Sequence, residues 1–456
     1  MRLRILLTAV LVAGLVVLQP LGAEARGGIS TIRDPEIESI IRLFATPIFQ
    51  AAGLRPSTVE IYLVNDKSIN AFVAGGQKLF INTGLLMQSD SANQVIGVIA
   101  HEAGHIQGAH LARTHDAMRN ATVESILAMV VGVAASVAAG KPEAIGAAMA
   151  TGQEAGLRGF LRYSRTQESA ADAAAMRLLD ATDQSAEGLL EFLTKLEDQE
   201  LLVAGRRDPY LLSHPLARDR ISALQTFVAG QPRRSASSDD EEAARLHRRM
   251  VAKLVGFLEP FPVVMRRYPP EDTSFAARYA RAVALYRKPD LTAALAAVND
   301  LIREAPSDPY LYELKGQMLF ENGRPAEALA PYRTAAELSS GAASIRIELA
   351  RVQLALNDPA LVDDALRNLQ AARIVEPRNI LMWNTLGEAY HRRGEETESL
   401  LARAEATLLE GRFDEAIYHA NRAQQALPNG SPGWLQAADI AQQAERRRDQ
   451  QRRDGG

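Results

Sequence analysis

The stretch VIAHEAGHIQGAH, from Val98 to His110, decides the fold of the N-terminal half. It holds two histidines, His101 and His105, four residues apart, and Glu102 directly follows the first. Each residue of an α-helix turns by about 100°, so the two histidines lie one turn apart on one face. Both imidazoles can then bind one metal ion, and Glu102 lies beside that ion, where it can act as general base. The pattern predicts a zinc site on a helix.

The third zinc ligand must come from elsewhere in the chain. A catalytic zinc ion takes three protein ligands and keeps one open position, and the chain has 8 histidines and no cysteine. On a continuous helix His110 points away from the ligand pair, and His115 lies farther on, so both are interpreted as surface or packing residues. The segment SRTQESAADAAAMRLL, residues 164–179, predicts a second helix with Glu168 and Asp172 on one face. Glu168 is the expected ligand, and Asp172 is expected to accept a hydrogen bond from a ligand histidine.

A further element, LLSHPLARDRI at residues 211–221, places His214 before a proline and Arg218 and Arg220 after it. A histidine or arginine brought over the metal can stabilise the oxyanion of a tetrahedral intermediate. Alternatively, His214 takes the fourth zinc position and keeps the site idle. The residues alone leave both roles open.

The rest of this region predicts helices around a small β-sheet. Residues 34–54 have the apolar spacing of a helix, and Asp34 can cap it. Residues 58–64 alternate like a strand, and residues 70–86 indicate two strands joined by a glycine turn, followed by a helix start. Gly104, in the helix of the histidine pair, costs about 1 kcal/mol relative to alanine, which predicts a neighbour packed closely against it.

The N-terminus indicates export. Arg2 and Arg4 precede an apolar run from Ile5 to Leu18, and small residues precede a cleavage site after Ala25. The alternative is an uncleaved membrane anchor, for which the run is short. A chain without cysteine uses neither disulfides nor a cysteine-linked lipid. The expected location is the Gram-negative periplasm.

Length and composition limit the number of domains and the kinds of partner. The chain has 456 residues, which predicts two or three domains. Its 51 basic and 55 acidic residues give a net charge of -4, so no broad positive field favours nucleic acid as a partner. The segment 122–157 is rich in small and apolar residues, and its uncharged run is marginal for a membrane span. We interpret it as a buried or subunit-facing helical hairpin, with a lid, a membrane-surface contact or a true span as alternatives.

The C-terminal third is repetitive. Ala294 and Ala328 are 34 residues apart. Ala365 and Ala416 mark later copies of the same pattern, and the copy at Ala365 comes about three residues later than a strict repeat would place it. This resembles tetratricopeptide (TPR) repeats, whose period is 34 and whose helix pairs stack into a solenoid with a concave face. The segment 387–404 is compressed, which predicts one degenerate unit. The predicted organisation is a signal peptide (1–25), a zinc metalloprotease domain (26–229), a linker and connecting helix (230–272), a TPR domain (273–440) and a solvated basic tail (441–456).

Four motifs together resemble one family. HEAGH at 101–105, ESAAD at 168–172, NAFVAGG at 70–76 and SHP at 213–215 are similar to the HtpX / CAAX-prenyl-endopeptidase family of gluzincin metallopeptidases. The resemblance implies a mainly α fold, with a protease domain of helices and a small β-sheet followed by the TPR solenoid. It implies one zinc ion held by His101, His105 and Glu168, with Glu102 as base and Asp172 behind a ligand. It gives His214 a catalytic or regulatory role and makes Arg220 the oxyanion partner. It also implies that the substrate backbone adds to an edge strand formed by Phe72, Val73, Ala74 and Gly75.

The signal and the TPR array add an expected role. Periplasmic members of this family with such an array act in quality control of outer-membrane β-barrel proteins. The resemblance therefore implies an endopeptidase for unfolded or stalled clients, whose TPR face docks on the client or on the barrel assembly machinery. Two alternatives remain: a TPR chaperone or assembly factor with a latent zinc site, and an inner-membrane quality-control protease.

Overall fold

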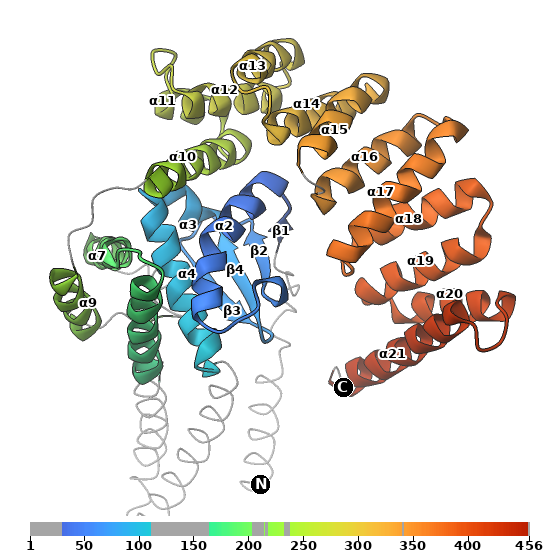
Figure 1. The fold of residues 1–456 in the computed structure, drawn as a ribbon, viewed down its shortest axis with the longest axis horizontal. Coiled ribbons are helices and arrows are strands. Elements are labelled where there is room, and N and C mark those ends of the chain that lie inside the picture. The colour runs from blue at the N-terminus through green and yellow to red at the C-terminus, as the bar shows by residue number, and fades with distance from the viewer. Residues whose placement is uncertain are drawn as a thin grey trace, which may run out of the picture. The chain divides into compact units, whose positions relative to one another are not determined.

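The computed structural model describes residues 30–110, 164–202, 214, 218–231, 238–339 and 342–454. The chain divides into two compact units (Figure 1): Met1–Arg33 with Phe44–Arg233, and Asp34–Leu43 with Arg234–Gly456. The predictions for the signal peptide, for residues 122–157 and for His115 lie outside the described residues. Within the described ranges, no helix is both long enough and apolar enough to cross a membrane. The predicted class, mainly α with a small sheet in the N-terminal domain, is confirmed.

The first unit contains a four-stranded sheet with the order β1-β2-β4-β3. β2 and β4 are parallel, and the outer strands pair antiparallel to them. Gly75 and Gly76, with φ of 54° and 93°, form the predicted turn between β3 and β4, since glycine adopts positive φ without strain. β3 lies at the sheet edge beside the helix that carries the histidine pair. The strands are β1 (Thr31–Ile32), β2 (Glu60–Val64), β3 (Ala71–Ala74) and β4 (Lys78–Asn82).

The histidine pair lies on α4 (Ala92–Gln107), which follows α3 (Thr83–Gln88). The hydroxyl of Ser91 caps α4 by accepting from the N–H of Gln94 at 3.3 Å. The Gln94 side chain accepts in turn from the N–H of Asp90 at 2.9 Å. These two bonds fix the residue at which the helix begins. The direction in which each later side chain of α4 points around the helix axis follows from that start.

Small residues let α4 approach its two neighbouring helices closely. A Cβ on Gly104 would lie 2.8 Å from the carbonyl oxygen of Ala171, in the helix over residues 164–181. A Cβ on Gly97 would lie 2.9 Å from the backbone nitrogen of Leu189 in α7 (Glu187–Leu202). The predicted close packing at Gly104 is therefore present, and α9 (Arg218–Gly230) packs on the other side of α7.

Helix α2 (Pro35–Ala51) begins in the second unit and continues into the first. The Asp34 carboxylate caps it by accepting from the N–H groups of Glu36 and Ile37 at 3.0 and 2.9 Å. The apolar face predicted for this helix is buried, and its members are Ile37, Ile40, Ile41 and Phe44.

In the second unit, α10 (Ser238–Leu258) and α11 (Phe261–Arg267) precede five helix pairs. The first helices of the pairs begin at residues 275, 309, 343, 380 and 413, so the first two intervals equal the repeat length. The short turn η3 (Pro359–Leu361), before the second helix of the third pair, explains the copy that comes three residues late. The pairs are α12 (Phe275–Arg287) with α13 (Leu291–Glu304), α14 (Pro309–Glu321) with α15 (Pro325–Leu338), α16 (Ala343–Ala355) with α17 (Val362–Val375), α18 (Ile380–Arg393) with α19 (Glu396–Leu409), and α20 (Phe413–Ala426) with α21 (Pro432–Asp454).

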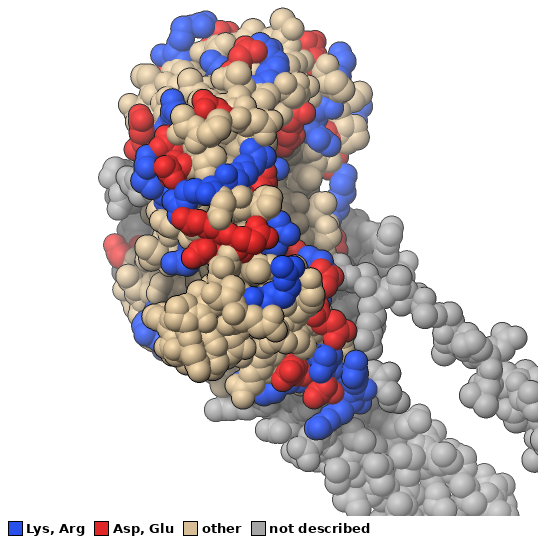
Figure 2. All heavy atoms as spheres, turned by 90° about the vertical axis from the view of Figure 1, so that its right-hand side faces the viewer, with Lys and Arg blue, Asp and Glu red and all other residues tan. Residues whose placement is uncertain are grey.

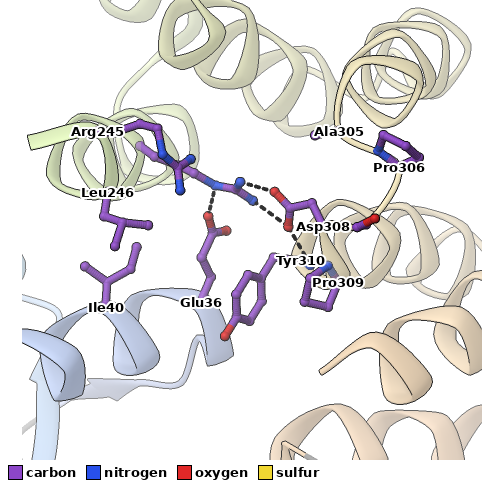
Figure 3. Close-up of a pocket in the computed structure, with 11 residues that line it drawn as sticks. Glu36, Ile40, Arg245, Leu246, Ala305, Pro306, Asp308, Pro309 and Tyr310 are labelled. Carbon is purple, nitrogen blue, oxygen red and sulfur yellow. Dashed lines mark hydrogen bonds and ion pairs between the residues drawn. The ribbon is translucent and has the colours of Figure 1, made fainter. Parts of the chain in front are cut away.

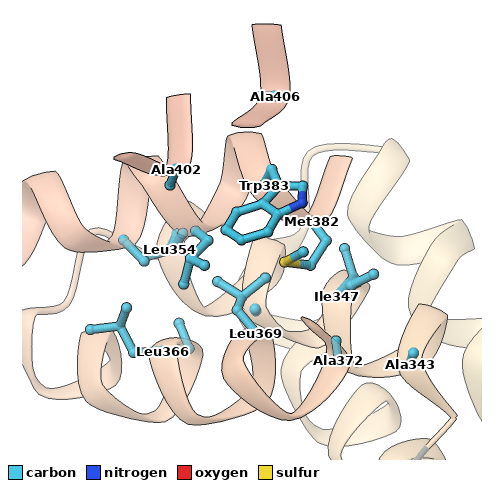
Figure 4. Packing of buried hydrophobic residues seen from close by; sticks show 14 of the residues in the cluster. Ala343, Ile347, Leu354, Leu366, Leu369, Ala372, Met382, Trp383, Ala402 and Ala406 are labelled. Carbon is cyan, nitrogen blue, oxygen red and sulfur yellow. The ribbon is translucent and has the colours of Figure 1, made fainter. Parts of the chain in front are cut away.

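Two parts of the repeat region bear on the sequence predictions. The fourth pair, which holds the compressed segment 387–404, spans 33 residues from the start of α18 to the start of α20, one fewer than the 34-residue repeat. Helices α18 and α19 keep 14 residues each, and only their connection is short. Trp383 and Met382 of α18 pack with Leu369 of α17 in one apolar cluster (Figure 4). The residues predicted as a basic tail continue α21 to Asp454, and Arg448 among them forms an ion pair with Asp414 at 2.9 Å.

A buried ionic cluster, which the sequence did not reveal, lies at the start of the second unit. Glu36 and Asp308 both bind the guanidinium of Arg249, beside a pocket (Figure 3). The amino group of Lys253, fully buried in α10, lies 3.1 Å from Glu36 and 3.7 Å from Glu313 of α14. Charges removed from water require such partners, so these pairs fix α2, α10 and α14 against one another.

Candidate active site

Four buried side chains of the first unit converge on one point. His101 and His105 come from α4, Glu168 from the helix over residues 164–181, and His214 from the chain before α9. One ligand atom from each lies within 4.8 Å of all the others. The Nε2 atoms of the two α4 histidines are 3.1 Å apart, and Glu168 oxygens lie 3.4 Å and 3.3 Å from them.

These distances and donors fit a tetrahedral metal site. Zinc binds imidazole nitrogen and carboxylate oxygen at about 2.0–2.1 Å, which puts neighbouring ligand atoms roughly 3.3 Å apart. Burial lowers the pKa of His105 to about 4, so its ring is neutral, as a ligand must be. The pKa of Glu168 is lowered although burial opposes this, because all three histidines hydrogen-bond to it. The site therefore offers a neutral imidazole at His105 and an ionised carboxylate at Glu168.

Asp172 and Arg220 lie behind the ligands. Oδ1 of Asp172 is 2.8 Å from Nδ1 of His101, the ring nitrogen remote from the other ligands. Burial would lower the pKa of His101, but Asp172 and Glu168 raise it to about 10, so metal binding at Nε2 would release a proton. Arg220 donates from Nε and Nη2 to Asp172 at 2.5 and 2.9 Å, and its Nη1 lies 3.0 Å from Glu168. The guanidinium thus contacts the two carboxylates, and the oxyanion role expected for Arg220 stays a prediction; Arg218 is exposed at the start of α9.

Glu102 is fully buried. The N–H of Val73 and Nε2 of His214, which lies 3.5 Å from Oε1, face its carboxylate, and neither oxygen has a close hydrogen bond from a described residue. Burial raises its pKa, which the nearby His214 and His101 partly offset. A buried carboxylate without close hydrogen bonds is costly, so this group indicates a place where water or substrate is bound. A carboxylate with a raised pKa is suited to take a proton near neutral pH.

The ring of His214 lies close to both His101 and Glu168. Its Nδ1 lies 3.2 Å from both oxygens of Glu168 and 3.4 Å from Nε2 of His101. Its Nε2 lies 3.3 Å from the carbonyl oxygen of Ala71, at the start of β3. The ring therefore connects the ligand cluster to the sheet edge.

The predicted edge strand is present beside this cluster. Phe72, Val73 and Ala74 lie in β3, which pairs only with β4 in the described sheet, and Gly75 begins the turn. The Phe72 ring stacks on Phe80 of β4 with centroids 4.9 Å apart.

The sequence interpretation missed one buried histidine at the site. His110 was expected on the far side of a continuous helix, but its Nδ1 lies 3.0 Å from Nδ1 of His105. Helix α4 ends at Gln107, so the angular argument no longer applies beyond it. Gly108, a typical helix-stop residue, was the signal available in the sequence.

Comparison with known proteins agrees with this geometry. Residues 31–228 match peptidase family M48, and residues 271–309 and 279–343 match the tetratricopeptide repeat. The chain thus carries a peptidase M48 domain followed by TPR repeats, and it is a metallopeptidase. It is 25% identical over 411 residues to the beta-barrel assembly-enhancing protease of Yersinia pestis, covering 90% of this chain and 83% of the relative. It is 25% identical over 420 residues to the protein of that name from Escherichia coli (strain K12), with the same two coverages. The resemblance inferred from the motifs is confirmed.

Proposed function

We propose that this chain is an exported zinc endopeptidase of the periplasm that degrades misfolded or stalled envelope proteins, with outer-membrane β-barrels as the main clients. The observation that carries the proposal is the meeting of His101, His105 and Glu168 around one point, with the buried carboxylate of Glu102 beside it. The names of the similar proteins support the choice of client.

In the proposed reaction, His101, His105 and Glu168 would hold zinc, which would supply Lewis-acid polarisation of the peptide carbonyl and the attacking water. Glu102 takes the proton of the water through a carboxylate oxygen and passes it to the leaving amine. Asp172 holds Nδ1 of His101, so that Nε2 of that ring faces the other ligands. Arg220 in turn holds the two carboxylates in place.

The substrate backbone would add to β3. An edge strand presents unpaired N–H and C=O groups, and an extended peptide can bind them as a further strand. β3 packs beside α4, so a peptide paired along Phe72 to Gly75 would pass close to the cluster. This mode recognises the peptide backbone and suits unfolded clients of varied sequence.

His214 would act as a latch in the resting protein. Its Nδ1 lies among the ligand atoms, and its Nε2 is near the first residue of the edge strand. A ring in that position competes with substrate for the open metal position, which supports the latch over the oxyanion role.

The TPR unit would bind the client or the assembly machinery. Over the face drawn in Figure 2, Lys and Arg side chains are interspersed with Asp and Glu side chains, and uncharged areas lie between them. Such a mixed surface suits a protein partner better than a polyanion. Several large apolar side chains are exposed on the repeats: Leu338, Ile374, Val375, Leu381, Tyr418 and Leu435.

The proposal is tested with purified residues 26–456 by measuring zinc per chain and casein cleavage, for the wild type beside Glu102→Gln. One zinc ion in both proteins, with cleavage in the wild type alone, is the expected result. Loss of zinc in the variant would show that Glu102 is not simply the base.

The position of His214 among the ligands favours a second candidate function, a TPR assembly factor whose zinc site is latent. Zinc in both proteins without cleavage in either would favour that candidate, and the His214→Ala variant would then separate it from a latched enzyme. Carbonate extraction of cells tests the location, since a mature chain that stays in the membrane pellet contradicts a periplasmic protein.

A further inference from the structure

We propose that His110 is a positioning residue of the metal site, which accepts a hydrogen bond from Nδ1–H of His105 and so fixes the nitrogen that His105 presents to the metal. The proposal rests on the zinc site of the proposed function. It concerns a residue outside the HExxH pattern, on the side of His105 that faces away from the other ligands.

The contact between the two rings is close and buried. The Nδ1 atoms of His110 and His105 are 3.0 Å apart, and the ring planes are nearly perpendicular, at 82°. Each residue is only 7% exposed. Water therefore has little access to this hydrogen bond, so the partner of His105 Nδ1 is set by the protein.

The positions of the nitrogens define the tautomers. Nε2 of His105 lies 3.1 Å from Nε2 of His101 and 3.3 Å from Glu168, so it is the nitrogen that faces the metal position. A ligating nitrogen carries no proton, so the proton of the neutral ring is on Nδ1. Nδ1 of His110 must then be the acceptor, with its own proton on Nε2. Oδ1 of Asp172 lies 2.8 Å from Nδ1 of His101, and so each ligand histidine has one polar neighbour at its remote nitrogen.

The backbone after α4 brings His110 to this place. The N–H of Gly108 still bonds to the carbonyl of Gly104 at 2.9 Å, but Ala109 has φ of 49°, so the backbone leaves the helical path before His110. A Cβ on Gly108 would lie 2.3 Å from Nε2 of His110, so the ring lies directly over the glycine. A positive φ at alanine is unfavourable and persists where the surroundings enforce it, which is typical of functional sites.

A contact from the opposite helix holds the same turn. The side-chain Nε2 of Gln167 donates to the carbonyl oxygen of His110 at 3.4 Å. Gln167 directly precedes the ligand Glu168 in the sequence. This hydrogen bond therefore connects the backbone of His110 to the helix segment that carries the third ligand.

The test measures zinc affinity by chelator competition in the full chain, for the wild type and His110→Ala. Partners of this kind change metal affinity by about 10–100-fold, so we expect His110→Ala to bind zinc that much more weakly. His110→Asn places an amide oxygen where Nδ1 was and should restore most of the affinity. His391→Ala, at an exposed histidine of α18, is the matched control and should bind zinc as the wild type does.

A second readout separates positioning from folding. The visible spectrum of the cobalt-substituted protein reports ligand geometry, and we expect it to change in His110→Ala and to recover in His110→Asn. If His110→Ala does not fold, Gly108→Ala keeps the histidine but displaces its ring, and should weaken zinc binding similarly. Ala109→Gly keeps the turn and should bind zinc normally.

The outcomes are distinct. Wild-type affinity in both His110→Ala and Gly108→Ala would overturn the inference and leave the proposed function intact. Weaker binding with an unchanged cobalt spectrum and no rescue by His110→Asn would also overturn it, since that indicates a packing role only. A wild type that binds no zinc would refute the proposed function instead.

Discussion

Nε2 of His214 lies 3.5 Å from Oε1 of Glu102, while Nδ1 of the same ring lies 3.2 Å from both oxygens of Glu168. A single imidazole thus spans the proposed base and a proposed ligand. In the proposed mechanism an incoming peptide carbonyl would need the same space, so movement of this ring would control access to the site.

Replacing His214 with alanine is expected to increase casein cleavage several-fold, because the competing donor is gone while the three other ligands remain. An oxyanion role would instead lower the rate by about 10²-fold or more. Initial rates with zinc-saturated protein distinguish the two, and Arg218→Ala, at an exposed residue of the same element, is the control. An unchanged rate would remove His214 from the mechanism.

Gly104→Ala is expected to reduce both stability and zinc affinity. The new Cβ would lie 2.8 Å from the carbonyl oxygen of Ala171, so α4 and the helix of Glu168 must move apart. Forcing a group into a packed contact costs about 1–3 kcal/mol. Chemical denaturation and chelator competition measure the two effects. Gly230→Ala is the control, because a Cβ there meets no atom within 4 Å, and it should change neither stability nor zinc affinity. Equal stability and zinc affinity in the two variants would contradict close packing at Gly104.

Arg220→Lys is expected to weaken zinc binding by about 10-fold, since lysine cannot make the paired bonds that the guanidinium gives to Asp172. Arg220→Ala should weaken zinc binding more than Arg220→Lys does, because it removes the positive charge beside two buried carboxylates. Zinc affinity and the rate at saturating zinc are the measurements. A lower rate at saturating zinc with unchanged zinc affinity in Arg220→Lys would instead support the oxyanion role.

Glu313→Gln should reduce the pH dependence of stability in the repeat unit. Burial raises the pKa of Glu313 to about 8, against about 4.5 for the unfolded chain, although Lys253 opposes the shift. The folded protein therefore binds this proton more tightly. That contribution to stability is complete below pH 4.5 and is lost as pH rises to 8.

Melting temperatures at pH 5 and pH 8.5 test this prediction. The wild type should lose several degrees more than Glu313→Gln over this range, since 1 kcal/mol corresponds to about 2–4 °C for a unit of this size. Exposed Glu337→Gln is the control. Equal pH dependence in the wild type and Glu313→Gln would show that Glu313 remains ionised.

Removing the metal is expected to lower the melting temperature of the first unit and abolish cleavage. A ligand that binds only the folded state stabilises it by about 2.7 kcal/mol at 100 times its dissociation constant. Calorimetry with and without a chelator measures the shift, and added zinc should reverse it. A chelator that stops cleavage without changing the transition would mean that the metal is not bound at the buried cluster.

The sequence by itself determined the local features of this protein. Helical spacing placed His101 with His105, the Gly75–Gly76 turn marked the strand pair, and the 34-residue period marked the helix pairs. Each of these depends on residues near one another in the chain, whose relation is set by backbone geometry alone.

Only the tertiary structure decided the contacts between distant segments. It placed His214 among the ligands, turned Arg220 toward Asp172, and buried Lys253 among carboxylates. It also turned His110 back onto His105, because α4 ends at Gln107 and no periodicity extends past a helix end. These contacts depend on how closely helices pack and on where buried charges find partners. Those are properties of the folded interior, which the spacing of residues along a chain does not contain.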